Sequence, residues 1–209
     1  MKIYITGCAK SGTTLLYRLF DYFKNVEILR PNEVKLEKLI NTSNNKTTIG
    51  KRRYNTILSL DMGLSKLESQ RKVILDNDIK IVNVVRDGRD VILSSNYKVS
   101  PKRWISCIQQ RKIFANIISL EVKYEDLIYH PDQIQEDIAE KFGLVIDYKF
   151  SIYPTKLDDK YFVDEYKPIY KPRPINDASI HKDIEAYKKL CKPDQIQPFE
   201  QCLKEFNYV

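Results

Sequence analysis

The chain has 209 residues, of which 43% are hydrophobic and 30% are charged, a balance typical of a globular protein. This length suits one well-buried core better than two, so we expect a single domain over residues 1–209. Its apolar runs are too short to cross a bilayer, and a strand-like pattern begins at Lys2. These features lead us to expect a cytoplasmic protein without stable membrane insertion. The net charge of +7 favours a polyanionic partner but does not identify it.

Cysteine and histidine usage argues against a metal centre. The four cysteines are scattered without close pairing: Cys8, Cys107, Cys191 and Cys202. This spacing predicts reduced, packed thiols rather than a zinc site or a disulfide framework. The two histidines are His130 and His181, too few for histidine-rich metal chemistry, so we expect no metal.

The N-terminal region predicts a strand, a loop and a helix. Lys2–Gly7 is a short β-rich apolar run that ends in glycine, and Thr13–Lys24 carries leucines and phenylalanines at helical spacing. A second short strand is expected at Val26–Leu29, followed by a short helix or turn over Glu33–Ile40. The polar stretch Asn41–Arg53 is rich in turn formers and predicts a surface loop, whose basic end is interpreted as solvated.

The middle of the chain continues the alternation. A helix is expected at Asp61–Leu75, and Ile79–Asp87 is the clearest buried strand because it is nearly continuous in β-branched residues. A helix at Arg89–Tyr97 and another at Pro101–Asn116 precede a further strand at Ile118–Leu127. An amphipathic helix is then expected at Pro131–Phe142, and an irregular segment at Phe150–Pro174. The last two helices are expected at Asp183–Cys191 and Asp194–Phe206.

Strands that alternate with helices predict the α/β class. We expect three layers: a central parallel β-sheet flanked by helices, similar to that of P-loop NTPases. Ligands of such sheets bind at the carboxyl ends of the strands.

The stretch ITGCAKSGTTLL, from Ile5 to Leu16, has the glycine spacing of a phosphate-binding loop. Its glycines allow successive backbone N–H groups to point inward, and the following helix adds its positive end. Thr13 stands where a P-loop has lysine, and Lys10 lies within the loop instead. A glycine turn between strand and helix needs no ligand, so the loop alone leaves both interpretations open.

A second anion-binding feature follows the clearest strand. Arg86 ends this strand, and Ser94 lies eight residues further on, about two helical turns away. An arginine here can grip a phosphate with its two-pronged guanidinium group, and the serine can add a hydroxyl. A strand-end salt bridge from Arg86 to Asp87 or Asp90 is the alternative.

These motifs together resemble the sulfotransferases that use 3′-phosphoadenosine 5′-phosphosulfate (PAPS). Lys10-Ser11-Gly12-Thr13-Thr14 is similar to the family's 5′-phosphosulfate loop, and Arg86 to Ser94 is similar to its 3′-phosphate segment. Gly88 stands in place of the usual proline, and we expect this replacement to loosen the turn. Val122–Leu144 resembles the strand end and helix in which a tyrosine, here Tyr124, lies near the adenine. The resemblance covers Lys2–Leu144 and, more weakly, the C-terminal helix.

The resemblance implies roles for individual residues. Lys10 would neutralise the leaving phosphate, and Ser11, Gly12, Thr13 and Thr14 would hold the 5′ end of PAPS. Arg86 and Ser94 would hold the 3′-phosphate. Glu33 would be the general base, since the segment Pro31–Leu36 is similar to that of carbohydrate-modifying members. Lys171 and Arg173 would belong to a late basic loop over the 3′-phosphate, although the usual sequence of that loop is absent. Trp104 is interpreted as a core residue rather than an adenine platform.

The implied reaction is metal-independent transfer of a sulfuryl group from PAPS to a hydroxyl or amine, which releases 3′,5′-adenosine bisphosphate (PAP). A carbohydrate, a lipid or a small metabolite is the expected acceptor. The alternatives are a P-loop kinase of a small molecule or nucleoside, and a catalytically silent nucleotide-binding relative. A nucleic-acid-binding module is a further alternative, but no DNA- or RNA-binding signature supports it. The sequence does not indicate the oligomeric state.

Overall fold

The structure is a computed structural model of the whole chain. Its described residues are 1–30, 33–43, 45–52, 63–94, 99–153 and 184–209. The expected irregular segment Phe150–Pro174 lies mostly outside these residues, as do Lys171 and Arg173.

The described residues form a parallel sheet of five strands in the order β2-β3-β1-β4-β5. The strands are β1 (Lys2–Gly7), β2 (Val26–Ile28), β3 (Thr47–Lys51), β4 (Ile79–Val85) and β5 (Ile118–Lys123). The expected parallel α/β fold is therefore confirmed. Because all strands run in one direction, the residues that follow β1, β3, β4 and β5 lie along the same edge of the sheet.

Side-chain alternation along the central strands builds two cores, one on each face of the sheet. Ile3 and Ile5 of β1 pack with Val82 and Val84 of β4 on one face. Tyr4 of β1 points to the opposite face and packs with a different set of buried residues. Both faces of β1 and β4 are therefore buried, as is typical of a parallel sheet covered on both sides.

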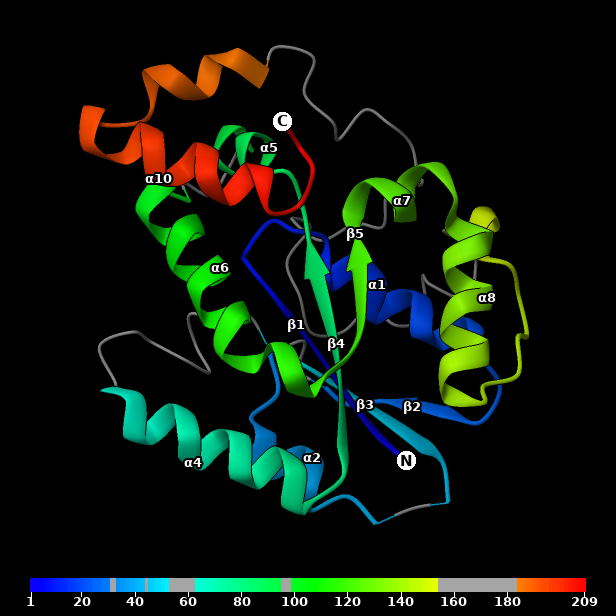
Figure 1. The fold of residues 1–209 in the computed structure, drawn as a ribbon. Helices are drawn as coiled ribbons and strands as arrows, with labels where there is room; N and C mark the ends of the chain where they lie inside the picture. The colour runs from blue at the N-terminus through cyan, green and yellow to red at the C-terminus, as the bar shows by residue number, and fades with distance from the viewer. Residues whose placement is uncertain (31–32, 44, 53–62, 95–98, 154–183) are drawn as a thin grey trace.

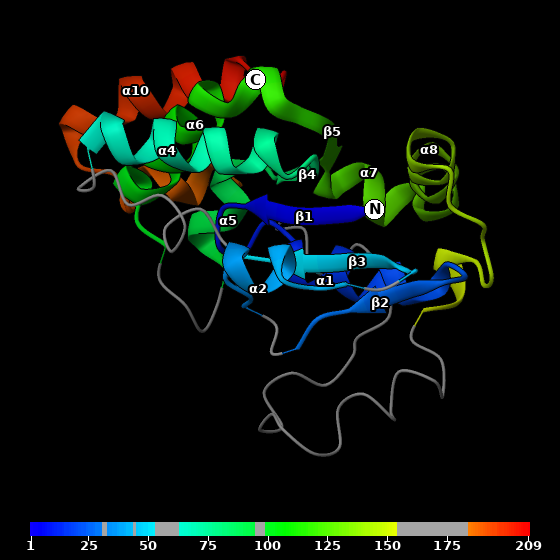
Figure 2. The ribbon, with the colours of Figure 1, turned by 90° about the horizontal axis from the view of Figure 1, so that it is seen from below.

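Helices cover both faces, which gives the three layers shown in Figures 1 and 2. One face is covered by α1 (Thr13–Leu19) with its 3-10 extension η1 (Phe20–Tyr22), by α7 (Tyr124–Tyr129) and α8 (Pro131–Phe142), and by η4 (Phe150–Ile152). The other is covered by α2 (Leu36–Ile40), α4 (Gly63–Asp76), α5 (Gly88–Leu93), α6 (Pro101–Phe114) with η3 (Ala115–Ile117), η7 (Ile184–Lys189) and α10 (Pro193–Lys204). Trp104 belongs to the core on this second face, and the centroid of its ring lies 4.7 Å from the ring centroid of Phe199.

The prediction of a surface loop over Asn41–Arg53 is wrong for the second half of this segment. Thr47–Lys51 forms β3, which pairs with β1 on one side and with β2 on the other. Thr48 and Ile49 are buried, and the side chain of Lys51 is only 2% exposed. The β-branched residues Thr47, Thr48 and Ile49 favour a strand, and this local signal is stronger than the turn formers that precede it.

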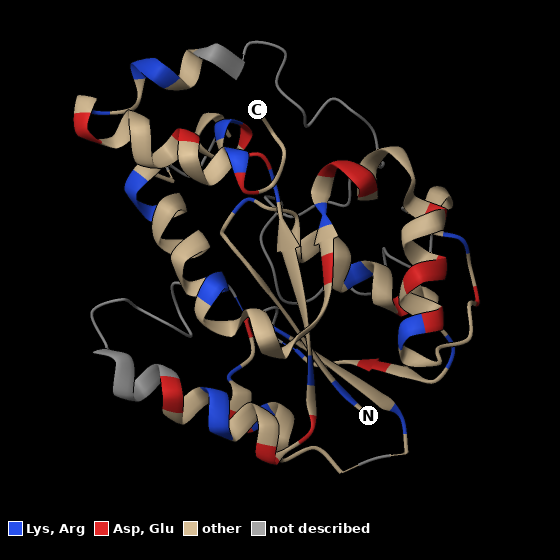
Figure 3. Cartoon of the chain, viewed as in Figure 1, with Lys and Arg blue, Asp and Glu red and all other residues tan. Residues whose placement is uncertain are grey.

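Other boundaries differ by smaller amounts. The strand expected at Ile118–Leu127 ends at Lys123, because Tyr124 already begins α7. The helix expected at Pro131–Phe142 is confirmed with both of its ends. Among the described residues, no helix is long and apolar enough to span a membrane. Figure 3 shows acidic and basic residues mixed along α4 and α8 rather than a uniformly basic helix face.

Candidate active site

The loop between β1 and α1 has the backbone of an anion cradle. Lys10 and Gly12 adopt left-handed conformations, with φ of 70° and 89°, on either side of Ser11. The Ser11 N–H donates to the carbonyl of Cys8 at 3.2 Å, which closes the turn, and the Gly12 carbonyl accepts the first bond of α1 from Leu16. Left-handed residues in such a turn direct neighbouring N–H groups toward a common point. The loop therefore has a backbone conformation compatible with the phosphate-binding loop that the sequence predicts.

Arg86 joins the end of β4 to this loop. Its Nη1 donates to the carbonyl oxygen of Lys10 at 2.9 Å, and its Nη2 lies 3.4 Å from Oδ2 of Asp90. Both side chains of this ion pair are buried, at 6% and 2% exposure. The alternative of a strand-end salt bridge is thus correct for Asp90, and the same guanidinium group also holds the loop.

Tyr124 completes the junction from the end of β5. Its ring lies under the Arg86 guanidinium group, which is 4.4 Å from the ring centroid. The same ring packs against Gly12 so closely that a Cβ atom there would approach Tyr124 Cδ2 to 2.3 Å. Three neighbouring strands, β1, β4 and β5, therefore bring the loop, Arg86 and Tyr124 into direct contact.

A second cluster lies on the β3 side of the loop. Nζ of Lys51 donates to Oε1 of Glu33 at 2.8 Å and to the hydroxyl oxygen of Thr14 at 3.0 Å. The Glu33 side chain is 32% exposed, and its Oε1 pairs with the buried Lys51. Lys51 thus connects the glutamate that we predicted as a base to the first turn of α1.

The turn that carries Glu33 is fixed by its neighbours. The Val34 N–H donates to the carbonyl of Lys51 at 2.9 Å, and the Tyr4 hydroxyl donates to the carbonyl of Val34 at 2.6 Å. Burial raises the pKa of Tyr4 well above its usual value, so the hydroxyl remains a donor. Gly50 leaves room for this ring, because a Cβ atom at position 50 would lie 2.9 Å from Tyr4 Cδ2. Two neighbouring strands, β1 and β3, therefore hold Val34, the residue that follows Glu33.

The other predicted site residues have fewer contacts that bear on a site. Ser11 and Thr13 are buried, and Ser94 is the partly buried C-cap residue of α5. Among the described residues, none forms a hydrogen bond with the buried Ser11 hydroxyl. Lys171 and Arg173 lie outside the described residues.

Lys51 and Tyr4 are the functional candidates that sequence reasoning missed. Lys51 was interpreted as part of a solvated basic cluster, and Tyr4 as an ordinary strand residue. The β-branched run before Lys51 was the available signal for the lysine. The role of Tyr4 depends on the packing of Glu33's turn against β3, and we find no local signal for it.

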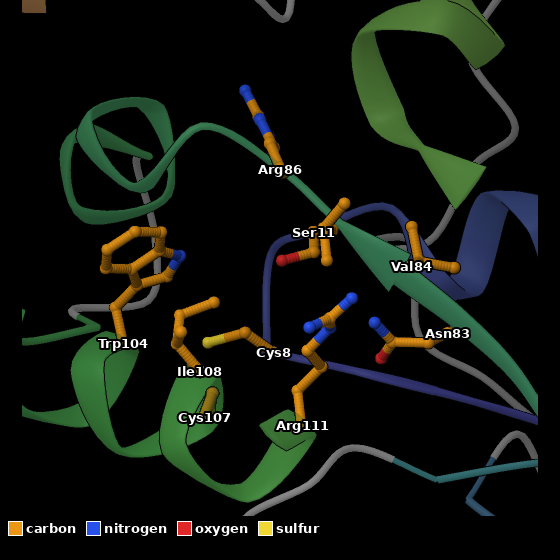
Figure 4. Close-up of a pocket in the computed structure, with 10 residues that line it drawn as sticks. Cys8, Ser11, Asn83, Val84, Arg86, Trp104, Cys107, Ile108 and Arg111 are labelled. Atoms are coloured by element: carbon orange, nitrogen blue, oxygen red, sulfur yellow. The ribbon is translucent and has the colours of Figure 1, made fainter. Parts of the chain in front are cut away.

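A small cavity lies beneath the loop, between β4 and α6. Its lining residues are Cys8, Ser11, Asn83, Val84, Val85, Arg86, Trp104, Cys107, Ile108 and Arg111. Figure 4 shows the Arg86 side chain directed away from the other lining side chains. A side-chain hydrogen bond with Cys107 and burial raise the pKa of Cys8 well above its usual value. Both cysteines are buried here, as the prediction of packed thiols requires.

Gly88 has a packing role at the start of α5. A Cβ atom at this position would lie 2.6 Å from Cε2 of Trp104, so the indole ring occupies the space of a side chain. We had expected the replacement of proline by glycine to loosen this turn. The structure instead shows a close contact that only glycine permits.

Residues 1–102 match the family model of the sulfotransferase domain. This segment contains the loop, Glu33, Lys51, Arg86 and Ser94. The resemblance to sulfotransferases that the motifs predicted is thus confirmed. No curated protein sequence gives a significant match.

Solved sulfotransferase structures share the fold over almost the whole chain. Mouse sulfotransferase SULT7A1 complexed with PAP is 14% identical, with a TM-score of 0.55, 98% of this chain covered and 83% of that chain. The sulfotransferase domain from the curacin biosynthetic pathway is 12% identical, with a TM-score of 0.62 and coverages of 99% and 97%. The sulfotransferase domain of the Synechococcus PCC 7002 olefin synthase is 15% identical, with a TM-score of 0.59 and coverages of 100% and 95%. At these identities the likeness concerns the fold.

Proposed function

We propose that this protein is a sulfotransferase that moves a sulfuryl group from PAPS to a hydroxyl or amine of an acceptor. The observation that carries the proposal is the junction of three motifs. Arg86 donates to the Lys10 carbonyl, and the Tyr124 ring packs against both Arg86 and Gly12. Each of these residues comes from a motif that resembles a nucleotide-contacting segment of the sulfotransferases. Their contact supports one shared nucleotide site.

The residues fit the two ends of the nucleotide. The loop from Lys10 to Thr14 offers backbone N–H groups in a left-handed turn and the buried Ser11 hydroxyl, which suits the 5′-phosphosulfate. Arg86 lies at the adjacent strand end, where its guanidinium group suits the 3′-phosphate together with Ser94. Tyr124 lies beside Arg86 and suits the adenosine. Lys171 and Arg173 complete the proposed set of 3′-phosphate residues.

In the proposed reaction, the acceptor oxygen or nitrogen attacks the sulfur in line with the bond to the 5′-phosphate. The new bond to sulfur forms as the bond from sulfur to the bridging oxygen breaks, and PAP leaves with the bonding electron pair. Lys10 stabilises the negative charge that grows on the leaving phosphate. Glu33 takes the proton of the acceptor as the new bond to sulfur forms, so that an anionic sulfate ester or sulfamate and PAP result. No step requires a metal ion.

Lys51 is proposed as the positioning residue of this base. Its ammonium group holds one oxygen of Glu33 and also contacts Thr14, so the base and the 5′ end of the nucleotide site share one cation. The partial exposure of Glu33 leaves the carboxylate open to an acceptor. A carbohydrate, a lipid or a small metabolite is the proposed acceptor class.

Calorimetric titration with PAP and with ATP plus Mg²⁺ tests the proposal. We expect micromolar or tighter binding of PAP by the wild type, and a Kd increased about thirtyfold in Arg86→Ala, since loss of a charge-assisted pair costs roughly 2 kcal/mol. Arg71→Ala is the matched control, because Arg71 lies on α4 and pairs with Glu68 on the same helix.

Two results would contradict the proposal. A preference for ATP with Mg²⁺ over PAP would favour the kinase alternative. Tight PAP binding without sulfuryl transfer to any of a panel of hydroxyl and amine acceptors would favour the catalytically silent relative.

A further inference from the structure

The turn that presents Arg86 is held by groups that the proposed reaction does not use. The Asp87 N–H donates to Oε1 of Glu125 at 2.9 Å, and Glu125 is the second residue of α7. The Asp87 carboxylate accepts from the Arg89 N–H at 2.9 Å and pairs with the Arg89 guanidinium group at 2.7 Å. Glu125 and Arg89 are thus the two anchors of the turn from Arg86 to Gly88.

One residue near the C-terminus contacts both anchors. The Tyr208 hydroxyl donates to Oε2 of Glu125 at 3.0 Å, and the Tyr208 carbonyl accepts from Nη2 of Arg89 at 2.7 Å. Figure 1 shows the C-terminal segment leaving α10 and ending beside α5. Tyr208 therefore joins two groups that are 36 residues apart in the sequence, Glu125 of α7 and Arg89 of α5, next to the point where Arg86 follows β4.

Tyr208 is itself held in place by contacts that do not involve its hydroxyl group. Its N–H donates to the carbonyl of Leu203 at 3.1 Å, which ties it to the end of α10. Lys123 donates to the carbonyl of Phe206 at 3.0 Å and lies 5.4 Å from the centre of the Tyr208 ring. Loss of the hydroxyl alone should therefore leave the segment docked.

The hydroxyl acts on a carboxylate that burial disfavours. Burial raises the pKa of Glu125, and the bonds from Asp87 and Tyr208 oppose this rise by stabilising the charged form. A partly desolvated carboxylate with two donors in fixed directions has little freedom to move. The Asp87 N–H that it holds directly follows Arg86 in the chain.

We propose that Tyr208 is a positioning residue of the nucleotide site: through Glu125 and Arg89 it fixes the turn from Arg86 to Gly88 and thereby aims the Arg86 guanidinium group at the 3′-phosphate. This inference rests on the proposed function, because it assumes a ligand with a 3′-phosphate. It assigns to the C-terminal segment a part in nucleotide recognition without direct contact.

The test compares PAP with adenosine 5′-monophosphate, which lacks the 3′-phosphate, in calorimetric titrations of the full chain. Tyr208→Phe keeps the ring and removes the hydroxyl, and we expect its Kd for PAP to rise about fivefold while its Kd for the monophosphate stays the same. In the Arg86→Ala background, Tyr208→Phe should have no further effect, since the group that it positions is gone. If the role of Tyr208 were merely structural, Tyr208→Phe would weaken the binding of both ligands, and its effect would add to that of Arg86→Ala.

A tyrosine outside this hydrogen-bond network provides the control. Tyr129→Phe is the matched control, because Tyr129 is 56% exposed at the end of α7. An unchanged ratio of the two Kd values in Tyr208→Phe, with wild-type PAP binding intact, would overturn this inference alone. A wild type that does not bind PAP would instead overturn the proposed function.

Discussion

The ammonium group of Lys51 lies 2.8 Å from the carboxylate of Glu33, and the lysine is buried while the glutamate is one-third exposed. Lys51 is therefore enclosed next to Thr14, whereas the side chain of Glu33 reaches the surface in part. We propose that Lys51 acts as a fixed cation that holds the predicted base.

Replacing the base should separate chemistry from binding. Glu33→Gln keeps an oxygen for Lys51 but removes the proton acceptor, so we expect kcat to fall about a hundredfold with an unchanged Kd for PAP. Steady-state kinetics and calorimetry measure the two quantities. Glu37→Gln, at an exposed position on α2, is the control and should behave as the wild type. Full activity of Glu33→Gln would exclude Glu33 as the base.

Removing the cation should also lower activity while the fold remains. Lys51→Met retains a long unbranched side chain, and the Glu33 carboxylate that loses its partner belongs to a side chain that is one-third exposed, so water can solvate it. We expect kcat to fall about tenfold, because Glu33 and Thr14 lose their shared donor, and the free energy of unfolding to change by less than about 1 kcal/mol. Lys72→Met removes an exposed lysine that pairs with Asp76 and should leave kcat unchanged. Equal kcat values for the two variants would contradict the positioning role of Lys51.

Gly12 should tolerate a methyl group poorly, for two separable reasons. Gly12→Ala places a Cβ atom at positive φ and against the Tyr124 ring, so we expect a loss of about 3 kcal/mol in the free energy of unfolding. Gly143→Ala shares the positive φ, but its Cβ would meet nothing within 4 Å, and it should cost about 1 kcal/mol. Denaturant unfolding measures both. Equal losses would show that Tyr124 does not pack against the loop in solution.

Gly88 should depend on Trp104 in the same way. Gly88→Ala forces the indole ring to move, and we expect a loss of about 2 kcal/mol in the free energy of unfolding. Combining it with Trp104→Phe should recover about 1 kcal/mol relative to the sum of the single variants, because the smaller ring leaves space. Strict additivity in this double-mutant cycle would argue against the contact.

Much of the sheet could be predicted from local patterns. Ile79–Asp87 reads as a buried strand because both of its faces are apolar, and Pro131–Phe142 begins with proline and ends before a glycine, which fixes both helix ends. These predictions succeed because each depends on a few consecutive residues. The structure also places the loop and the arginine after β4 in contact, since parallel strands end on one edge. Their role as anion sites stays a prediction.

The parts that failed depend on contacts between distant segments. Lys51 looks like one member of a basic surface cluster until β3 is placed between β1 and β2, where its side chain is enclosed. Gly88 alone predicts a loosened turn, because its contact with Trp104 arises only when α6 packs next to it. Tyr208 is 83 residues away from Glu125, and nothing in either local sequence indicates their hydrogen bond. Only tertiary packing specifies these relationships.

Because β1 is the middle strand, it divides the edge formed by the carboxyl ends of the strands into two halves. Glu33 and Lys51 lie on the β3 side of the loop, whereas Arg86, Tyr124 and Glu125 lie on the β4 and β5 side. Under the proposed function, a change next to β2 and β3 would alter the acceptor side of the site without touching Arg86 and Tyr124, the residues proposed to hold the donor nucleotide.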